Sequence, residues 1–475
     1  PFVDVGSGRT VVDVCTGYQH TCAMLDDYSL KCWGDNNYGQ LGYGDVVDRG
    51  DDLNEMGDNL PTVNVGTILN AESVDCGFYH TCAALNNGMM KCWGYNNYGQ
   101  LGQGNVDTLG DDSWEMGDLP LIDLGSVPAI HECFDLTPTF DPTITFDPTF
   151  DPTVYVFPFY SCKSDFSGDY HNCVMFTDST VKCFGYNQYG QLGLGNTANR
   201  GDGTGEMGDY LALVSLNGDV RSLALGYVHS CAAFTDFTAA CWGRSNFGQL
   251  GYGSTLSRGD GANEMGVNLA AIDVGTNVFV NLIGTGQHHT CMVSTFGLVK
   301  CWGYNNNGQL GYGDTSNRGD GANEMGDNLD FVDLGTTCSV VTDLSAGISH
   351  TCVVCSNGNV KCWGYNFYGQ LGQGDTTTRG DGTFEMSDYL SAIDLGSGLS
   401  VSEVFSGGYH NCVLFSDGSL KCWGNGNIGQ LGYEDTSRRG DGSNEMGSNL
   451  PFVDVGSGRT VVDVCTGYQH TCAML

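Results

Sequence analysis

Basic residues are scarce in this chain. Its 475 residues include 18 lysines and arginines against 55 aspartates and glutamates, which gives a formal net charge of −37 at pH 7. A surface this acidic repels phosphate groups, so the composition argues against nucleic-acid binding and against attraction to an anionic membrane surface. We therefore expect neither a nucleic-acid partner nor insertion into a membrane.

Long hydrophobic runs and helical periodicity are also missing. No sustained 3.6-residue pattern occurs, which argues against a helical fold. The sequence shows no initiator Met, signal peptide or transmembrane run, which is the pattern expected of a mature or excised piece of a secreted chain. It contains no Asn-x-Ser/Thr sequon, so N-glycosylation is not expected.

What the chain does contain is a repeat of about 60 residues. Each unit has His-[Thr/Asn/Ser]-Cys, ten residues before Cys-Trp-Gly, followed by Gly-Gln-Leu-Gly, an Arg-Gly-Asp stretch and Glu-Met. The anchoring histidines are His20, His80, His171, His229, His289, His350 and His410. Residues 451–475 are identical to residues 1–25. We therefore expect a seven-repeat domain at 1–450, with 451–475 beginning a next, identical unit of a tandem array.

The spacing of the cysteines predicts a β-hairpin in each unit. Placing Cys82 opposite Cys92 pairs Leu85 with Met89 and leaves Asn86–Gly88 as a three-residue loop that ends in Gly, a favoured connection. Each unit should then be an antiparallel sheet of about four strands. Because one such sheet cannot bury both faces, seven sheets arranged radially are expected, which is an all-β, seven-bladed β-propeller.

The repeat resembles that of the regulator of chromosome condensation family. The residues that carry the resemblance are Gly-x-x-His-[Thr/Asn/Ser]-Cys and Cys-Trp-Gly-x-Asn-x-x-Gly-Gln-Leu-Gly-x-Gly, and they cover the chain except for one insert. The family folds as a seven-bladed propeller, which the resemblance implies here too. Its members include an exchange factor for a small GTPase, an ultraviolet photoreceptor and a secreted β-lactamase inhibitor, so the fold does not imply one activity.

Fourteen of the 22 cysteines face each other across the predicted hairpins and are candidate disulfides. Zinc sites usually use cysteines separated by two to four residues, so the ten-residue spacing argues against metal binding. Disulfides place the protein outside the cytosol, as a secreted, extracellular or cell-surface protein. The predicted pairs are Cys22 with Cys32, Cys82 with Cys92, Cys173 with Cys183, Cys231 with Cys241, Cys291 with Cys301, Cys352 with Cys362, and Cys412 with Cys422.

The remaining cysteines are assigned less directly. Cys133 and Cys162 bracket an insert and are expected to join its two ends in a disulfide. The pairing of Cys15, Cys76, Cys338 and Cys355 stays open.

The insert at residues 134–161, in the second repeat, is rich in Pro, Thr and Phe. Its prolines favour an extended conformation. One hypothesis is a docking arm that lies in a groove of a neighbouring propeller, because the insert carries the aromatic residues Phe140, Phe146, Phe150, Tyr155 and Phe157. The alternative is a surface loop with O-linked sugars on Thr139, Thr143, Thr149 and Thr153.

Residues that recur once in each unit are interpreted as structural. We expect each repeated His to donate to a backbone carbonyl and each repeated Trp to pack between blades, because a catalytic site needs different groups at one place.

The Arg-Gly-Asp sequences are interpreted as turns in which Arg pairs with a carboxylate such as Glu324 or Asp327. The acidic loops leave calcium as a minor alternative. No catalytic residue, other metal or cofactor is predicted.

The preferred functional hypothesis is a non-enzymatic extracellular structural or interaction protein. Its propellers would assemble with copies of themselves into a fibre, sheath or surface appendage, that is, a homopolymer docked through residues 134–161. The second hypothesis is a discrete secreted binding module, lectin-like or a protein inhibitor. The third, a GTPase exchange factor, fits the predicted disulfides less well.

Overall fold

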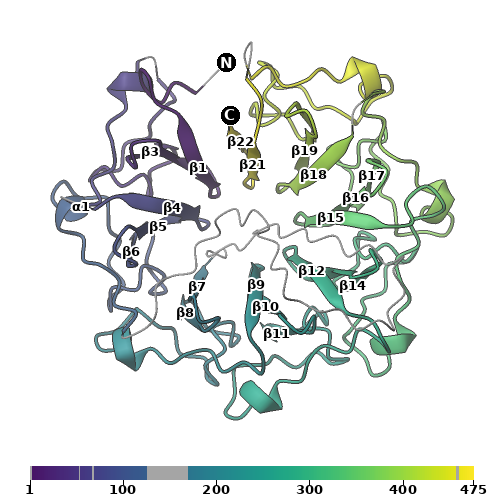
Figure 1. The fold of residues 1–475 in the computed structure, drawn as a ribbon, viewed down its shortest axis with the longest axis horizontal. Coiled ribbons are helices and arrows are strands. Elements are labelled where there is room, and N and C mark those ends of the chain that lie inside the picture. The colour runs from purple at the N-terminus through teal and green to yellow at the C-terminus, as the bar shows by residue number, and fades with distance from the viewer. Residues whose placement is uncertain are drawn as a thin grey trace, which may run out of the picture.

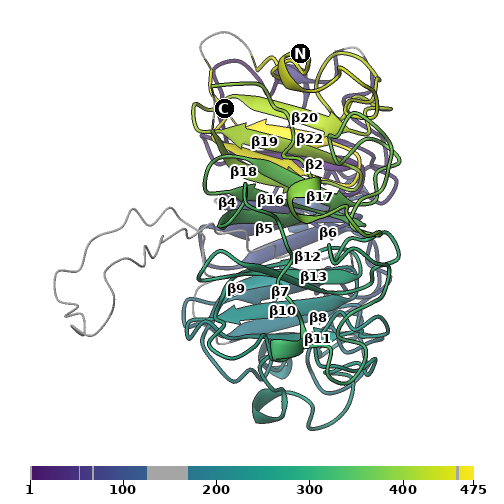
Figure 2. The same cartoon turned by 90° about the vertical axis from the view of Figure 1, so that its right-hand side faces the viewer.

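The protein is a ring of small antiparallel sheets, as the computed structural model of the chain shows (Figure 1). The structure describes residues 3–52, 54–66, 69–125, 170–398, 400–455 and 459–474. The strands run roughly along the axis of the ring, from one face to the other (Figure 2). The predicted all-β propeller architecture is therefore correct.

Three strands recur from unit to unit. The inner strands are β1 (Val11–Thr16), β4 (Ala71–Cys76), β9 (Val220–Leu225), β12 (Val280–Thr285), β15 (Val341–Ala346), β18 (Val401–Ser406) and β21 (Asp463–Thr466). The second strands are β2 (His20–Leu25), β5 (His80–Leu85), β7 (His171–Met175), β10 (His229–Phe234), β13 (His289–Ser294), β16 (His350–Cys355), β19 (His410–Phe415) and β22 (Thr471–Met474). The third strands are β3 (Leu30–Gly34), β6 (Met90–Gly94), β8 (Val181–Gly185), β11 (Ala239–Gly243), β14 (Val299–Gly303), β17 (Val360–Gly364) and β20 (Leu420–Gly424).

Helices are short and lie in the loops that follow the third strands. The single α-helical turn in the described residues is α1 (Glu115–Asp118). In six other units a 3-10 turn takes its place: η1 (Gly57–Asn59), η2 (Gly208–Tyr210), η3 (Gly266–Asn268), η4 (Gly326–Asn328), η5 (Ser387–Tyr389) and η6 (Gly447–Asn449). Among the described residues, no helix has the length and apolar character needed to cross a bilayer.

The predicted three-residue hairpin loop joins the second and third strands. In the second unit, the Leu85 N–H donates to Met89 O and the Gly88 N–H donates to Leu85 O, both at 2.8 Å. Gly88 has φ of +73°, a conformation that glycine adopts without steric cost. Three other units adopt the same left-handed conformation with a non-glycine residue, at Tyr28, Ser179 and Phe237. Loop geometry therefore prevails over residue preference at this position.

In the described residues six sheets have three strands, and the β7–β8 and β21–β22 sheets have two, whereas the sequence predicted about four strands in each unit. The fourth segment of each unit makes one backbone hydrogen bond to the third strand, as from Val63 N to Leu30 O at 2.7 Å. The same segment then turns to the following blade; for example, Gly208 N of η2 donates to Asp123 O at 2.5 Å. Because its hydrogen bonds are divided between two blades, the segment forms no ladder of its own and instead ties neighbouring blades together.

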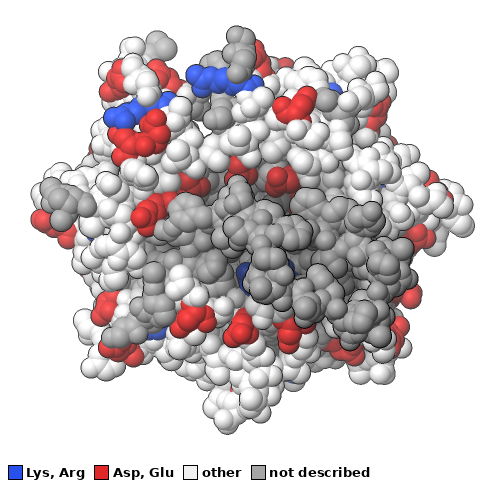
Figure 3. Space-filling view, viewed as in Figure 1, with Lys and Arg blue, Asp and Glu red and all other residues white. Residues whose placement is uncertain are grey.

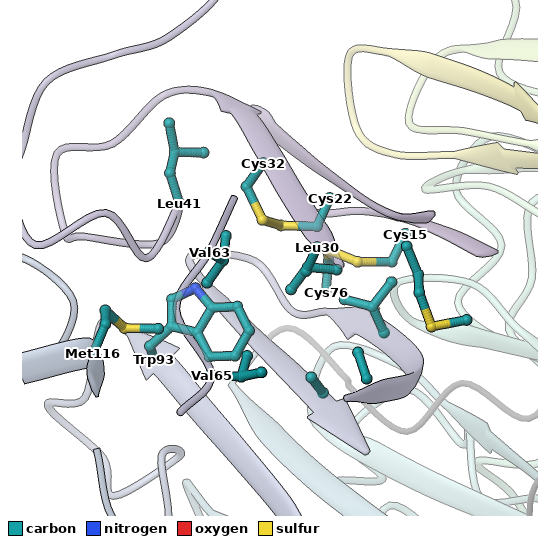
Figure 4. Packing of buried hydrophobic residues seen from close by; sticks show 14 of the residues in the cluster. Cys15, Cys22, Leu30, Cys32, Leu41, Val63, Val65, Cys76, Trp93 and Met116 are labelled. Atoms are coloured by element: carbon teal, nitrogen blue, oxygen red, sulfur yellow. A yellow bond between two sulfur atoms is a disulfide. The ribbon is translucent and has the colours of Figure 1, made fainter. Parts of the chain in front are cut away.

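The hydrophobic core lies between adjacent blades. In the cluster shown in Figure 4, Leu41 and Val63 of the first unit belong to the same group of buried side chains as Trp93 and Met116 of the second. Leu41 and Trp93 are both completely buried. A blade therefore buries its faces only against its neighbours, as expected for a propeller.

The sequence predicts that residues 451–475 begin a next unit, and their described part, residues 451–455 and 459–474, lies in the same ring (Figure 1). Their strands β21 and β22 form a two-stranded sheet between the β18–β20 sheet and the β1–β3 sheet (Figure 1). The Cys465 thiol donates to Val14 O at 2.9 Å, and the rings of Tyr18 and Tyr468 lie 4.7 Å apart.

Candidate binding face

One face of the ring carries a belt of aromatic side chains. Each first-to-second strand turn and each loop after a third strand opens on this face, because the first and third strands run in the same direction. The turns contribute Tyr18, Phe78, Tyr79, Tyr170, Tyr227, His288, Tyr409 and Tyr468. The loops contribute Tyr38, Tyr95, Tyr98, Tyr186, Tyr189, Phe247, Tyr304, Tyr365 and Tyr368. We call these residues the aromatic belt.

The rings of the aromatic belt contact one another from blade to blade. Tyr18 stacks on Phe78 with ring centroids 4.2 Å apart. Tyr98 lies 5.7 Å from Tyr170 and 4.6 Å from Tyr186, so it joins two neighbouring units. Offset and edge-to-face aromatic pairs at these distances contribute more stabilising free energy than the burial of their apolar surface alone. The belt therefore presents a preorganised aromatic surface rather than isolated side chains.

Four hydroxyl groups of the belt are held in the protonated form by their surroundings. Partial burial raises the pKa of Tyr95, Tyr186, Tyr365 and Tyr409, and neighbouring tyrosines raise it further. These four tyrosines are half-buried, so one part of each ring is still accessible. Amide side chains lie beside them, as where Asn97 Nδ2 donates to the Tyr95 hydroxyl at 2.9 Å. The face thus offers aromatic planes and uncharged hydrogen-bonding groups together.

A buried polar chain between blades holds the strand ends beneath the belt. His20 Nε2 lies 2.9 Å from Thr81 Oγ1, and Thr81 Oγ1 donates to Gln40 O at 2.9 Å. Because the hydroxyl proton is used on Gln40 O, His20 Nε2 must be the donor to Thr81, and its Nδ1 carries no proton. The same contact, at 2.7–3.2 Å, links His80 to Asn172, His171 to Ser230, His229 to Thr290, His289 to Thr351, His350 to Asn411 and His410 to Thr471.

The sequence predicted a backbone carbonyl as the partner of each repeated His, and that prediction is wrong. The imidazole instead contacts the Thr, Ser or Asn side chain that follows the His of the next blade. That side chain in turn donates a hydrogen bond to a backbone carbonyl, as Thr81 does to Gln40 O. Burial lowers the pKa of His20, His171, His229, His289 and His410 to about 3, and that of His80 and His350 to about 4. These histidines are neutral and structural at neutral pH.

The repeated tryptophans pack between blades, as predicted. Trp302 is completely buried, and its Nε1 donates to Gln249 O of the preceding blade at 3.1 Å. The same bond, at 2.9–3.0 Å, is made by Trp93, Trp242, Trp363 and Trp423. The Gly-Gln-Leu-Gly loop covers the indole closely: a Cβ on Gly42 would lie 2.6 Å from Trp93 Nε1. This glycine is therefore needed for the close approach.

Replacing Trp302 by Phe should lower the free energy of unfolding by about 1–2 kcal/mol, because the hydrogen bond to Gln249 O is lost while most of the packing is kept. Phe184 already occupies the equivalent position in the third unit, fully buried. Trp302→Ala should cost about 3–5 kcal/mol, because it leaves a cavity. Urea denaturation measures both values, and equal losses for the two variants would contradict this account of the site.

The structure places each of the seven predicted hairpin cysteine pairs in a disulfide. In every pair the two Cα atoms lie 4.1 Å apart across the second and third strands. The bonds join Cys22 to Cys32, Cys82 to Cys92, Cys173 to Cys183, Cys231 to Cys241, Cys291 to Cys301, Cys352 to Cys362, and Cys412 to Cys422. The structure therefore agrees, in all seven units, with the interpretation that two cysteines ten residues apart form a disulfide.

The structure also joins the four cysteines whose pairing the sequence left open. Cys15 bonds to Cys76 between the first two blades, and Cys338 bonds to Cys355. The sulfurs of Cys15, Cys22 and Cys76 lie within 4.8 Å of one another, but all three belong to disulfides, so we assign no metal there.

Cys133 and Cys162 both lie outside the described residues, so their pairing stays a prediction from the sequence.

The Arg-Gly-Asp sequences are turns held by their own loops, although not through the predicted carboxylates. Arg318 pairs with Asp314 at 2.7 Å, four residues earlier, rather than with Glu324 or Asp327. Glu324 instead accepts the backbone N–H groups of Asp320 and Gly321, and Asp327 accepts from Thr276. The side chain of Arg318 is mostly buried, with 23% of it exposed.

Acidic loop residues serve similar internal roles in the first unit. Asp45 pairs with Arg49, and Glu55 accepts the backbone N–H groups of Gly50 and Asp52. Carboxylates are numerous on the face seen in Figure 3, and basic residues appear in only a few places. Calcium binding by these loops stays a prediction.

The aromatic belt was not recognised in the sequence. A signal was present, since Tyr recurs directly after Cys-Trp-Gly and directly before Gly-Gln-Leu-Gly, but each tyrosine is unremarkable within its own unit. The predicted docking arm and glycosylation sites in residues 134–161 lie outside the described residues.

Comparison with known proteins identifies the repeat. The regulator of chromosome condensation (RCC1) repeat matches residues 11–40, 71–100, 166–191, 341–370 and 401–430 in one form, and residues 32–84 and 417–474 in a second. The ultraviolet-B receptor UVR8 of Arabidopsis thaliana is 25% identical over 485 residues, covering 97% of this chain and 89% of the receptor. The probable E3 ubiquitin-protein ligase HERC6 of Homo sapiens is 27% identical, covering 86% of this chain but 33% of that protein.

Solved structures agree on the fold. Prp20p from Saccharomyces cerevisiae superposes with a TM-score of 0.55 at 16% identity, covering 98% of this chain and 92% of the other. Human WBSCR16 has a TM-score of 0.54 at 16% identity, covering 99% and 88%. At this level of identity the likeness concerns the fold alone. From its repeats, relatives and architecture, the chain is a β-propeller protein of the regulator of chromosome condensation repeat type.

Proposed function

We propose that this propeller is an extracellular, non-enzymatic binding module whose aromatic belt binds neutral glycans. The observation that carries the proposal is the row of part-exposed aromatic side chains, most of them tyrosines, that contact one another over most of one face, from Tyr365 round to Tyr304. Protonated hydroxyls and amide side chains lie beside them. Sugar rings stack on aromatic planes through their apolar faces, and their hydroxyl groups need uncharged donors and acceptors. A net charge of −37 disfavours anionic polysaccharides, which is why the proposed ligand is neutral.

The proposed location outside the cell rests on the disulfides. Disulfides persist in oxidising compartments and are rare in the reducing cytosol. The described residues contain nine of them. A cytosolic or nuclear exchange factor for a small GTPase would not keep these bonds. Assembly with copies of itself through residues 134–161 stays a prediction from the sequence.

Binding to an array of neutral and anionic oligosaccharides tests the proposal. Titration with the best neutral glycan should then show at least about tenfold weaker binding for Tyr98→Ala, because one stacking contact contributes on the order of 1.4 kcal/mol. Tyr98 is suited to the test because its ring contacts two rings of the following unit, Tyr170 and Tyr186.

Tyr210→Ala is the matched control. Tyr210 lies in η2, outside the aromatic belt, and is 81% exposed, so its replacement should leave glycan binding unchanged. Binding of anionic glycans alone, or equal losses in Tyr98→Ala and Tyr210→Ala, would contradict the proposal.

A further inference from the structure

Arg244 takes the place of a tyrosine on the face that carries the aromatic belt. In four other units the residue directly after the third strand is a tyrosine: Tyr95, Tyr186, Tyr304 and Tyr365. In the fourth unit it is Arg244, which directly follows β11. The backbone is held in the same way, since the Arg244 N–H donates to Val228 O at 3.0 Å and the Tyr95 N–H donates to Tyr79 O at 2.9 Å. A guanidinium therefore lies where the belt otherwise has an aromatic ring.

The guanidinium of Arg244 lies over the ring of Tyr189 in the preceding blade. Its Cζ atom is 4.7 Å from the ring centroid, which matches the 4.6 Å between the rings of Tyr98 and Tyr186. The attraction of a cation to an aromatic face is electrostatic and supplies no oxygen acceptor to the N–H donors. The contact with Tyr189 thus holds the guanidinium in place and leaves its hydrogen-bonding capacity for a ligand.

Arg244 differs from the loop arginines in having no carboxylate partner. Arg49, Arg318, Arg379 and Arg439 each pair with the aspartate four residues earlier, at 2.7 Å. The guanidinium of Arg244 makes neither an ion pair nor a hydrogen bond with any residue that the structure describes. Arg244 is half-buried, so solvent and ligands can still reach it. An anionic group is what such a guanidinium binds best, through charge-assisted hydrogen bonds.

A neutral histidine lies near Arg244. The His288 ring contacts three belt rings at centroid distances of 5.5–6.4 Å: Phe247, Tyr227 and Tyr304. Burial, together with the positive charge of Arg244, lowers the pKa of His288 to about 4. At neutral pH this imidazole adds hydrogen-bonding groups but no second charge. The surroundings of Arg244 are therefore one fixed positive charge beside aromatic rings.

We propose that Arg244 forms a subsite for one hexuronic acid residue of the bound glycan, whose carboxylate accepts two hydrogen bonds from the guanidinium. The inference rests on the proposed glycan-binding function and refines the ligand to a chain of neutral sugars that carries a single carboxylate. The fork of N–H donors on a guanidinium matches the two oxygens of a carboxylate. The rings of Phe247 and Tyr304 offer planes on which the pyranose can stack.

A single carboxylate suits this face better than a phosphate or a polyanion. One guanidinium balances one negative charge. Another arginine that lies over a belt ring is Arg438, 4.7 Å from the centroid of Tyr368, and it belongs to the seventh unit, so the two cations cannot share one small anion. The net charge of −37 repels any ligand that brings further negative charge.

Labelling of arginines with phenylglyoxal, followed by digestion and mass spectrometry, tests the subsite on the full chain. Arg244 should react at least about tenfold faster than Arg318, because Arg318 is held in its ion pair with Asp314. Saturating D-glucuronate should slow the labelling of Arg244 at least about fivefold by mass action, whereas D-glucose should not. Labelling that is insensitive to glucuronate, or equal protection by acetate, would overturn the proposal.

Arg244→Tyr is the matched variant, because it gives the fourth unit the residue that Tyr95 provides in the second. The tyrosine should keep the contact with Tyr189, so loss of folding is not expected. In calorimetric titration the native chain should bind D-glucuronate at least about tenfold more tightly than D-glucose. Arg244→Tyr should lose this preference, and a variant that retains it would contradict the subsite.

Arg438→Gln is the control for general charge attraction. It removes one positive charge from a similar position over an aromatic ring, but Arg438 Nε already donates to Asn427 Oδ1 at 3.4 Å. This variant should keep the preference for glucuronate. An equal loss in Arg438→Gln and Arg244→Tyr would show attraction by net charge alone and would overturn the proposal.

The acidic-sugar subsite and the aromatic belt fail in different experiments. A chain that loses neutral glycans in Tyr98→Ala but shows no preference for glucuronate overturns the subsite alone. A chain in which glucuronate protects Arg244, while Tyr98→Ala leaves neutral-glycan binding unchanged, overturns the belt alone.

Discussion

Complete reduction of the disulfides should unfold the propeller at neutral pH. Each hairpin disulfide closes a short loop and contributes about 3 kcal/mol in the chain-entropy treatment. The seven hairpin bonds together amount to on the order of 20 kcal/mol, more than the net stability of about 5–15 kcal/mol that is typical of a domain. The bond between Cys291 and Cys301 is representative, with both residues completely buried.

Near-ultraviolet circular dichroism measured during reduction by a phosphine checks this result, with thiols counted in parallel. The double variant Cys291→Ala and Cys301→Ala should by itself lower the free energy of unfolding by about 3 kcal/mol. The double variant Cys338→Ala and Cys355→Ala serves as the matched pair outside the hairpin register. A fully reduced chain that still melts cooperatively would show that blade packing alone sustains the ring.

Acid should destabilise the protein steeply below pH 6.5. Burial lowers the pKa of the seven repeated histidines to about 3 or 4, whereas the unfolded chain has its ordinary value of 6.5. Between these values the unfolded state binds protons that the folded state cannot, so stability rises with pH and is lost as pH falls from 6.5 towards 4. Each histidine contributes about 1.4 kcal/mol per pH unit in that window.

Seven such groups give a slope on the order of 10 kcal/mol per pH unit, so unfolding is expected between pH 6.5 and about 5. Relief of repulsion among the carboxylates opposes this trend, but ordinary carboxyl groups titrate mainly below that range. Calorimetric melting temperatures measured from about pH 7.5 to about pH 5 give the slope. His350→Gln keeps a donor towards Asn411 and should reduce the proton uptake on unfolding by about one. A melting temperature that stays constant over this range would exclude the histidine account.

The aromatic belt shows how much of a repeat fold depends on its assembly. Within one unit, Tyr95 or Tyr98 is a tyrosine in a loop, and only the ring brings Tyr95 next to Tyr38 of one neighbour and Tyr98 next to Tyr186 of the other. The same holds for Arg244, which only the ring places over Tyr189. Sequence reasoning confined to the unit could identify these residues but not their neighbours.

Local features were determined by the sequence alone. The hairpin around Asn86–Gly88 and the facing of Cys82 and Cys92 follow from the ten-residue cysteine spacing, because strand register depends on the adjoining turn. The all-β propeller follows from the recurrence of this unit about every 60 residues. The tertiary structure decided the contacts between blades: the partner of each His, the division of the fourth segment between two blades, and the place of strands β21 and β22 in the ring. These contacts join residues about one repeat apart, and their geometry exists only once neighbouring sheets have packed against each other.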